Sequence, residues 1–265
     1  MAKHRVVLCA DDYGLSPGVS RGIRELLELE RLSATSCMTI YPEFEADGPL
    51  LQPHFGKADI GLHFTVTANQ PVRSVMRDAY LGRLDVASIA AELELQLASF
   101  VSVMGRQPDY IDGHQHVHLL PGIREAVTLA AHRIGAYVRS IREPVGLAMS
   151  LRPSPVEAAF LSWSARPLQA LALNHGLSTN RGFRGVRTFR ETTPYRELFR
   201  RMIRGAGEGC LIMCHPGFAD ARLANRDCVT KPREDELGYL VGEAFPRDLA
   251  YAGLVLSRLL DRRVC

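Results

Sequence analysis

The chain has 265 residues, 46% of them hydrophobic and 23% charged, which is enough apolar material for one large α/β domain. Its net charge is only +3 and no dense block of lysine and arginine occurs, so we expect no nucleic-acid partner. We predict a cytoplasmic protein with reduced thiols. No signal peptide is recognisable, no apolar stretch approaches the length of a membrane span, and the six cysteines lack zinc-finger spacing.

The first predicted strand ends in two adjacent carboxylates. The five residues from Val6 to Ala10 are apolar or small, as in a buried parallel strand, and Asp11 and Asp12 follow directly. Since side chains alternate along a strand, the two acids should point in different directions, so that one could hold a metal while the other moves a proton. The alternative is a plain strand-to-helix turn, because Asp also favours turns and caps helices.

Helices and strands then alternate along the chain. The clearest amphipathic helix covers 86–104, and two polar, Gly- or Pro-broken stretches, 68–84 and 176–194, are predicted to be loops over the site. The other expected helices are 17–31, 43–54, 121–134, 150–175, 195–204, 233–240 and 246–260, and the other expected strands are 35–41, 59–66, 110–112, 137–141 and 209–214. This alternation predicts one α/β domain of βα units around a mostly parallel sheet or barrel.

Histidines gather near the ends of these strands. His63 lies inside the strand at 59–66, where it is either a metal ligand or a hydrogen-bonded core residue. In the segment 112–118, three histidines occur within five residues: His114, His116 and His118. If the segment is extended, all three point the same way as Asp112; if a helix begins there, His114 and His118 stack. In either case one imidazole can reach a metal, unless the segment is a His-rich surface turn.

One carboxylate and two histidines on separate strands form a set that binds a first-row divalent cation and leaves positions for water and substrate. Zn²⁺ suits the nitrogen ligands, while Mg²⁺, Mn²⁺ and Co²⁺ remain open. His215 ends the strand at 209–214 and precedes Pro216-Gly217, so it could donate a proton to a leaving group or serve as a buried structural histidine.

Four motifs carry a family resemblance in their order along the chain: Ala10-Asp11-Asp12-Tyr13-Gly14, Gly61-Leu62-His63-Phe64, Asp112-Gly113-His114-Gln115-His116-Val117-His118 and Met213-Cys214-His215-Pro216-Gly217. With them, nearly the whole chain resembles the YdjC/ChbG family of carbohydrate deacetylases. The resemblance implies a single YdjC-like domain over 1–265, folded as an irregular (β/α) barrel. It also implies metal-dependent removal of acetyl groups from N-acetylated sugars.

The resemblance also assigns roles to residues. Asp11 is the implied general base and His215 the acid, and the implied ligands of a divalent metal, Zn or Mg, are Asp12, His63 and His114. Arg139 stands where the family tends to have a basic residue near the site, so we expect substrate contacts from Arg139, His116 and His118. Two departures are notable: Tyr13 stands where Phe is common, and Gly113 and Gln115 replace the Ser and second His often found there, which could alter substrate contacts.

The substrate stays open between two branches of this family. One contains chitooligosaccharide deacetylases, and the other, associated with hopanoid synthesis, resembles deacetylases of an N-acetylglucosaminyl lipid. Residues 142–144 and the apolar segment 160–173 slightly favour a bulky or lipid-linked substrate. The alternatives are a non-haem Fe(II) oxygenase, although the chain lacks a His-x-Asp motif, and a non-catalytic metal-dependent sugar-binding protein, which would not need Asp11. A homo-oligomer is compatible with the sequence.

Overall fold

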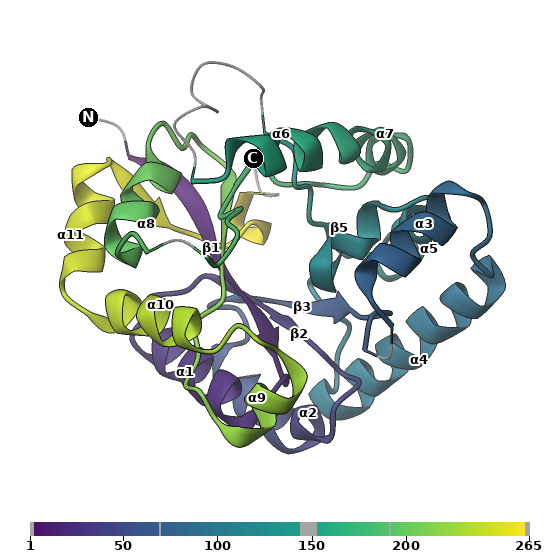
Figure 1. Cartoon of the computed structure of the whole chain (residues 1–265), viewed down its shortest axis with the longest axis horizontal. Coiled ribbons are helices and arrows are strands. Elements are labelled where there is room, and N and C mark those ends of the chain that lie inside the picture. The colour runs from purple at the N-terminus through teal and green to yellow at the C-terminus, as the bar shows by residue number, and fades with distance from the viewer. Residues whose placement is uncertain (1–2, 69, 144–152, 191, 263–265) are drawn as a thin grey trace.

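Figure 1 shows a computed structural model of the chain, which describes residues 3–68, 70–143, 153–190 and 192–262. The strands form one curled sheet with helices arranged around it (Figure 1). In chain order the strands are β1 His4–Tyr13, β2 Ala34–Cys37, β3 Asp59–Phe64, β4 Tyr110–Gly113, β5 Tyr137–Val138, β6 Gly182–Arg184, β7 Cys210–Cys214 and β8 Leu254–Leu256. All ladders between these strands are parallel.

The strand β1 is central because it pairs with β2, β7 and β8, within the order β5-β4-β3-β2-β1-β7-β6. Its residues from Val6 to Ala10 are 0% exposed, which explains the unbroken apolar run in a strand covered on both faces. The carboxyl ends of β1, β2, β3, β4 and β7 therefore meet at one rim, where α/β folds place their binding sites.

The two ends of this strand order are linked by an asparagine. The backbone N–H of Val138 donates to the carbonyl oxygen of Ser178 at 3.3 Å. Beyond this bond, the side-chain amide of Asn180 connects the two strands. Asn180 Oδ1 accepts from Ser140 N at 2.8 Å, and its Nδ2 donates to the carbonyl oxygens of Ser140 and Gly182, each at 2.7 Å. A side chain thus replaces missing ladder bonds, and the predicted irregular (β/α) barrel is confirmed.

Eleven α-helices are described: α1 Pro17–Glu28, α2 Pro42–Asp47, α3 Val72–Tyr80, α4 Val86–Met104, α5 Ile123–Ile134, α6 Pro155–Ser164, α7 Arg166–Asn174, α8 Tyr195–Ile203, α9 Ala221–Arg226, α10 Lys231–Val241 and α11 Ala244–Tyr251. Local signals mark several ends. Ser16 caps α1 by accepting from Val19 N, with Pro17 at the first helical position. The helix α4 begins at the Asp85 cap and ends at Gly105 with φ 69°, so its predicted bounds are confirmed.

Several expected elements are wrong in their bounds or type. The region 68–84 contains the helix α3, anchored by buried Val75 and Ala79, instead of an open loop. The region 176–194 contributes β6, and the helix expected at 246–260 ends at Tyr251, where Gly253 turns the chain into β8. The strand expected at 35–41 ends at Cys37. The start of the helix expected at 150–175 and Pro144 lie outside the described residues.

The helix α4 contradicts the expectation that no apolar stretch approaches the length of a membrane span. Within the described parts of the chain it is the one helix long and apolar enough to cross a membrane, with 19 residues, a mean hydropathy of 1.4 and 22% of that window buried. One such helix is weak evidence, because core helices pass the same test. Here the buried side chains of α4 include Leu93, Leu97, Phe100 and Met104.

Candidate active site and metal centre

A cavity of about 480 Å³ opens at the rim where the carboxyl ends of the central strands meet. Five of the predicted site residues at strand ends line it: Asp11, Asp12, His63, His114 and His215. They come from the ends of β1, β3, β4 and β7, which are far apart in sequence and adjacent in the sheet. The parallel strand order therefore brings these side chains together.

A backbone irregularity separates the two neighbouring carboxylates. The pairing of β1 with β2 shifts register between Ala10 and Tyr13, and Asp12 has φ 72°, in the left-handed region. The Asp12 carbonyl oxygen accepts from Leu15 N at 3.0 Å, which closes a tight turn. Asp11 and Asp12 consequently bind different partners, although both are almost fully buried.

Asp12 lies between two imidazoles. Its Oδ1 is 3.3 Å from His63 Nε2 and 3.1 Å from His114 Nδ1, and the ligand atoms of all three residues lie within 4.8 Å of one another. Burial alone would raise the pKa of Asp12, but Arg233 and the hydrogen bonds from His114 and His63 hold it well below its usual range. Asp12 therefore stays anionic. One carboxylate and two imidazole nitrogens suit a first-row divalent cation.

The second nitrogen of His63 is held by a carboxylate. His63 Nδ1 lies 2.6 Å from Asp112 Oδ1, which also accepts from the Ser36 hydroxyl at 2.5 Å. With its Nδ1–H donated to Asp112, His63 turns Nε2 toward Asp12, as metal-binding histidines commonly do. Burial works against protonation, but Asp112, Asp12 and Asp11 raise the pKa of His63 to about 10. A cation at Nε2 would have to displace that proton.

Asp11 forms a bidentate ion pair with Arg139. The Arg139 Nη1 and Nη2 atoms lie 2.6 and 2.9 Å from the two Asp11 oxygens, and its Nε lies 3.0 Å from Asp112 Oδ2. Arg139 is 0% exposed and does not line the cavity, whereas Asp11 does. Arg139 was expected to contact substrate; in this geometry it contacts the two carboxylates instead, and both Asp11 and Asp112 depend on it for charge balance.

The three clustered histidines separate because the backbone turns sharply. Gln115 and His116 have φ of 52° and 61°, so the segment is neither extended nor a regular helix start. His114 faces Asp12, while His116 packs its ring against Phe183 and His118 and still lines the cavity. His118 is 0% exposed and donates from Nε2 to the Arg139 carbonyl oxygen at 3.1 Å, so it cannot touch a molecule in the cavity.

Burial keeps these two histidines neutral. It lowers the pKa of His116 well below its ordinary value, helped by the positive charge of Arg139. The same two causes lower the pKa of His118 to about 3. A neutral His118 can donate to the strand that carries Arg139 without adding charge to the core, which indicates a positioning role in place of the expected substrate contact.

His215 reaches the cavity from the end of β7. Its backbone N–H donates to Glu236 Oε2 at 2.6 Å, and its ring meets the Phe189 ring edge-on at 5.2 Å between centroids. Burial lowers the pKa of His215, although the nearby charges of Asp12 and Asp11 oppose this effect. A histidine that is neutral at rest and readily gives up a proton once charged is suited to acid–base chemistry.

Two functional side chains have no clear signal in the sequence. Arg233 is 2% exposed, and its Nη2 lies 2.7 Å from Asp12 Oδ2 and 2.6 Å from Asp227 Oδ2. It belongs to the charged segment that opens α10, which resembles a solvated helix start. Ser36, which bonds Asp112, is one of two neighbouring hydroxyl residues in β2. Asp112 itself, by contrast, stands inside the histidine motif, and this position hinted that it belongs to the site.

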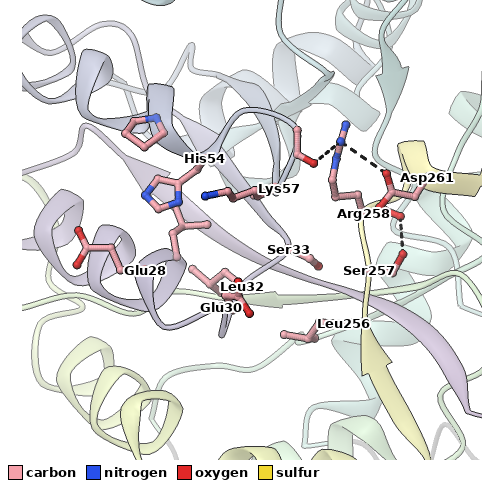
Figure 2. Close-up of a pocket in the computed structure, with 14 residues that line it drawn as sticks. Glu28, Glu30, Leu32, Ser33, His54, Lys57, Leu256, Ser257, Arg258 and Asp261 are labelled. Atoms are coloured by element: carbon pink, nitrogen blue, oxygen red, sulfur yellow. Dashed lines mark hydrogen bonds and ion pairs between the residues drawn. The ribbon is translucent and has the colours of Figure 1, made fainter.

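A second cavity of about 500 Å³ lies at the opposite ends of β2 and β3, where Ser33 and Ala58 precede those strands (Figure 2). Its charged groups are mixed in sign. Arg258, for instance, binds the Gly56 carbonyl oxygen at 2.7 Å and lies 3.6 Å from Asp261 Oδ1 (Figure 2). Because chemistry in parallel α/β folds is placed at the carboxyl ends of strands, we assign the active site to the first cavity.

The chain is similar over nearly its whole length to known proteins. The chitooligosaccharide deacetylase of Serratia marcescens is 30% identical over 274 residues, covering 97% of this chain and 98% of that protein. The Salmonella heidelberg protein of the same name is 28% identical over 273 residues, with the same coverage.

Solved structures show the same fold. An Enterococcus faecalis V583 protein, described as a cellobiose-phosphate cleavage protein, superposes with a TM-score of 0.72 at 20% identity, over 98% of this chain and 99% of that one. The Bc1960 peptidoglycan N-acetylglucosamine deacetylase gives a TM-score of 0.50 at 10% identity, over 98% and 87%. The family model described as YdjC-like protein matches residues 5–251, and the chain therefore belongs to the YdjC-like protein family.

Proposed function

We propose that this protein is a metal-dependent carbohydrate N-deacetylase that hydrolyses the acetamide of an N-acetylated amino sugar. The observation that carries the proposal is the grouping of Asp12, His63 and His114 around one point of a cavity that Asp11 and His215 also line. Three protein ligands beside a further carboxylate and a further imidazole are the parts that amide hydrolysis needs. The names of the relatives that match this chain nearly end to end support a chitooligosaccharide as substrate.

Asp12, His63 and His114 would hold a divalent cation, Zn or Mg, which would supply Lewis-acid chemistry toward the acetyl oxygen and a water. Asp11 takes the proton of the attacking water. Each carboxylate oxygen has two lone pairs, and Arg139 uses one on each oxygen, so Asp11 Oδ2 keeps an accepting position. Arg139 thereby orients the base without blocking it. His215, in its protonated form, gives that proton to the sugar nitrogen as the C–N bond breaks.

A glycolipid is the second candidate substrate. The helix α6 presents Val156, Phe160 and Trp163 to solvent, with exposures of 77%, 48% and 57%, at i, i+4 and i+7 positions along one face. The same helix contributes Glu157 and Leu161 to the cavity lining. An apolar face beside the mouth of the cavity could cover the lipid part of an N-acetylglucosaminyl lipid.

Acetate release measured by mass spectrometry tests the function. The purified protein, stripped with a chelator and reloaded with Zn²⁺, Co²⁺ or Mg²⁺, is incubated with N-acetylglucosamine, chitooligosaccharides and an N-acetylglucosaminyl lipid. We expect acetate from at least one of them, abolished by the chelator and restored by metal. Tight sugar binding without acetate release would indicate a sugar-binding protein, and O₂ consumption with bound iron would indicate the oxygenase alternative.

A further inference from the structure

Two aromatic rings line the cavity on opposite sides of the candidate catalytic residues. Tyr41 follows β2 and caps the start of α2, and Phe189 follows β6. In the strand order, β2 lies on one side of β1 and β6 lies beyond β7 on the other side. The end of β1 carries Asp11 and Asp12. The two rings therefore flank the place where an acetyl group would react.

Each of the two rings packs against an arginine side chain that is itself held by a glutamate. The guanidinium carbon of Arg226 lies 4.1 Å from the centroid of the Tyr41 ring, and that of Arg187 lies 4.4 Å from the centroid of the Phe189 ring. Each guanidinium is in turn held by a buried glutamate: Arg226 by Glu43 at 2.8 Å and Arg187 by Glu236 at 2.7 Å. Both arginines line the cavity together with the rings that they fix, so each ring reaches the cavity beside a cation.

Further observations indicate that these rings meet a ligand. Phe189 has φ 61°, a conformation that bulky residues rarely adopt and that tends to occur at ligand sites. Its ring also meets the imidazole of His215 edge-on. The Tyr41 hydroxyl, for its part, bonds to no other described residue, so it is available to a hydroxyl group of a ligand.

A pyranose ring matches this arrangement because one face presents C–H groups that pack on an aromatic ring while its hydroxyls hydrogen-bond at the edge. The two aromatic side chains match two pyranose rings, whereas a lipid-linked sugar offers one pyranose ring and an apolar chain. Resting on the proposed function, we propose that Tyr41 and Phe189 are specificity-determining residues. Each binds one pyranose ring of an oligosaccharide whose N-acetyl group lies between them.

Ligand binding and turnover are measured separately to test this. Calorimetric titrations use N-acetylglucosamine, N,N′-diacetylchitobiose and triacetylchitotriose against the full chain carrying Asp11→Asn, which slows turnover. Into that background we introduce Tyr41→Leu or Phe189→Leu, and the ring-retaining variants Tyr41→Phe and Phe189→Tyr. The control is Tyr251→Leu, which truncates an exposed ring at the end of α11 that does not line the cavity. KM and kcat for acetate release are measured with the same substitutions in the active chain.

We expect the parent to bind the two- and three-ring sugars more tightly than the single sugar. Either Leu variant should lose roughly 3- to 10-fold in oligosaccharide affinity and raise KM similarly, with kcat and single-sugar binding less affected. Phe189→Tyr and Tyr251→Leu should match the parent, and Tyr41→Phe, which keeps the ring but removes the hydroxyl, should lose less oligosaccharide affinity than Tyr41→Leu. Equal affinity for all three sugars, or unchanged oligosaccharide affinity in both Leu variants, would overturn the proposal. Acetate release by the parent would still support the proposed deacetylase function in that case. Conversely, binding that depends on Tyr41 and Phe189 without any acetate release would refute the proposed function but support the proposed role of these two rings.

Discussion

Replacing Asp11 or Asp12 by Asn should lower activity for different reasons, although the two carboxylates are adjacent. Asp12→Asn removes the anion that lies between His63 and His114, so bound metal should fall and excess metal should restore part of the turnover. Asp11→Asn leaves the three ligands in place, so metal content should stay near that of the parent. It removes the group that takes the proton, and added metal should not restore activity.

The size of the Asp11→Asn effect follows from what the carboxylate does in the site. Loss of a general base lowers kcat by about 10²- to 10⁴-fold, equivalent to about 3–5 kcal/mol of transition-state stabilisation. The substitution also weakens the anchor of Arg139, which is 0% exposed, and costs about 1–3 kcal/mol of folding stability. For a chain of this size that shifts Tm by about 2–12 °C, too little to unfold a protein of ordinary stability at 25 °C.

Asp59→Asn is a matched control, because Asp59 is also 0% exposed and paired with an arginine, Arg258 at 2.9 Å, but lies at the far end of the barrel. It should lower Tm to a similar extent without changing kcat. Metal content is measured by mass spectrometry on each variant, and acetate release is measured at 25 °C with and without excess metal. If Asp11→Asn keeps the parental kcat on a sugar that the parent deacetylates, Asp11 is not the base.

Three further predictions concern other residues of the candidate site. Asp112→Asn should weaken metal binding by roughly 10- to 100-fold and Ser36→Ala by less, measured by competition with a chromophoric chelator; unchanged affinity in both would show that the His63 orientation does not need them. Because the pKa of buried His118 is about 3 against an unfolded value near 6.5, its stabilisation is complete above pH 6.5 and is lost as pH falls toward 3. It should contribute about 2 kcal/mol to the loss of unfolding free energy down to pH 5, and His118→Gln should flatten that slope in urea titrations. His215→Gln should retain metal but lower kcat roughly 100-fold, and an unchanged pH profile of kcat/KM would assign His215 a structural role.

The parts of the site that could be predicted are those that follow buried apolar runs. Asp11, His63, His114 and His215 each stand near the end of such a run, and parallel strands bring their carboxyl ends to one rim regardless of the details of packing. The sharp turn at Gln115 and His116 could not be predicted, because neither is a glycine or asparagine and local propensity does not favour a left-handed backbone there.

Two short strands escaped prediction for a different reason. Gly182–Arg184 in β6 and Leu254–Leu256 in β8 have three residues each, too few for periodicity to distinguish a strand from a loop. The strand expected at 137–141 exists but is shorter than expected, since β5 ends at Val138. The pairing of β6 and β8 depends on neighbours far away in the chain, and β6 also accepts a hydrogen bond from the side-chain amide of Asn180. Such contacts exist only in the assembled barrel.

The charges supplied by distant segments give a reason for a divalent cation in particular. The buried network around the proposed site joins four carboxylates and two guanidinium groups: Asp11, Asp12, Asp112, Asp227, Arg139 and Arg233. Histidine ligands bind metal in the neutral form, so this network carries an excess of two negative charges, which a dication balances and a monovalent ion does not. A proton on His63 supplies only one of the two, and its pKa of about 10 reflects that excess. Proton and metal therefore compete for His63 Nε2, and metal affinity should fall as the pH is lowered, more steeply than at a site with unperturbed histidines.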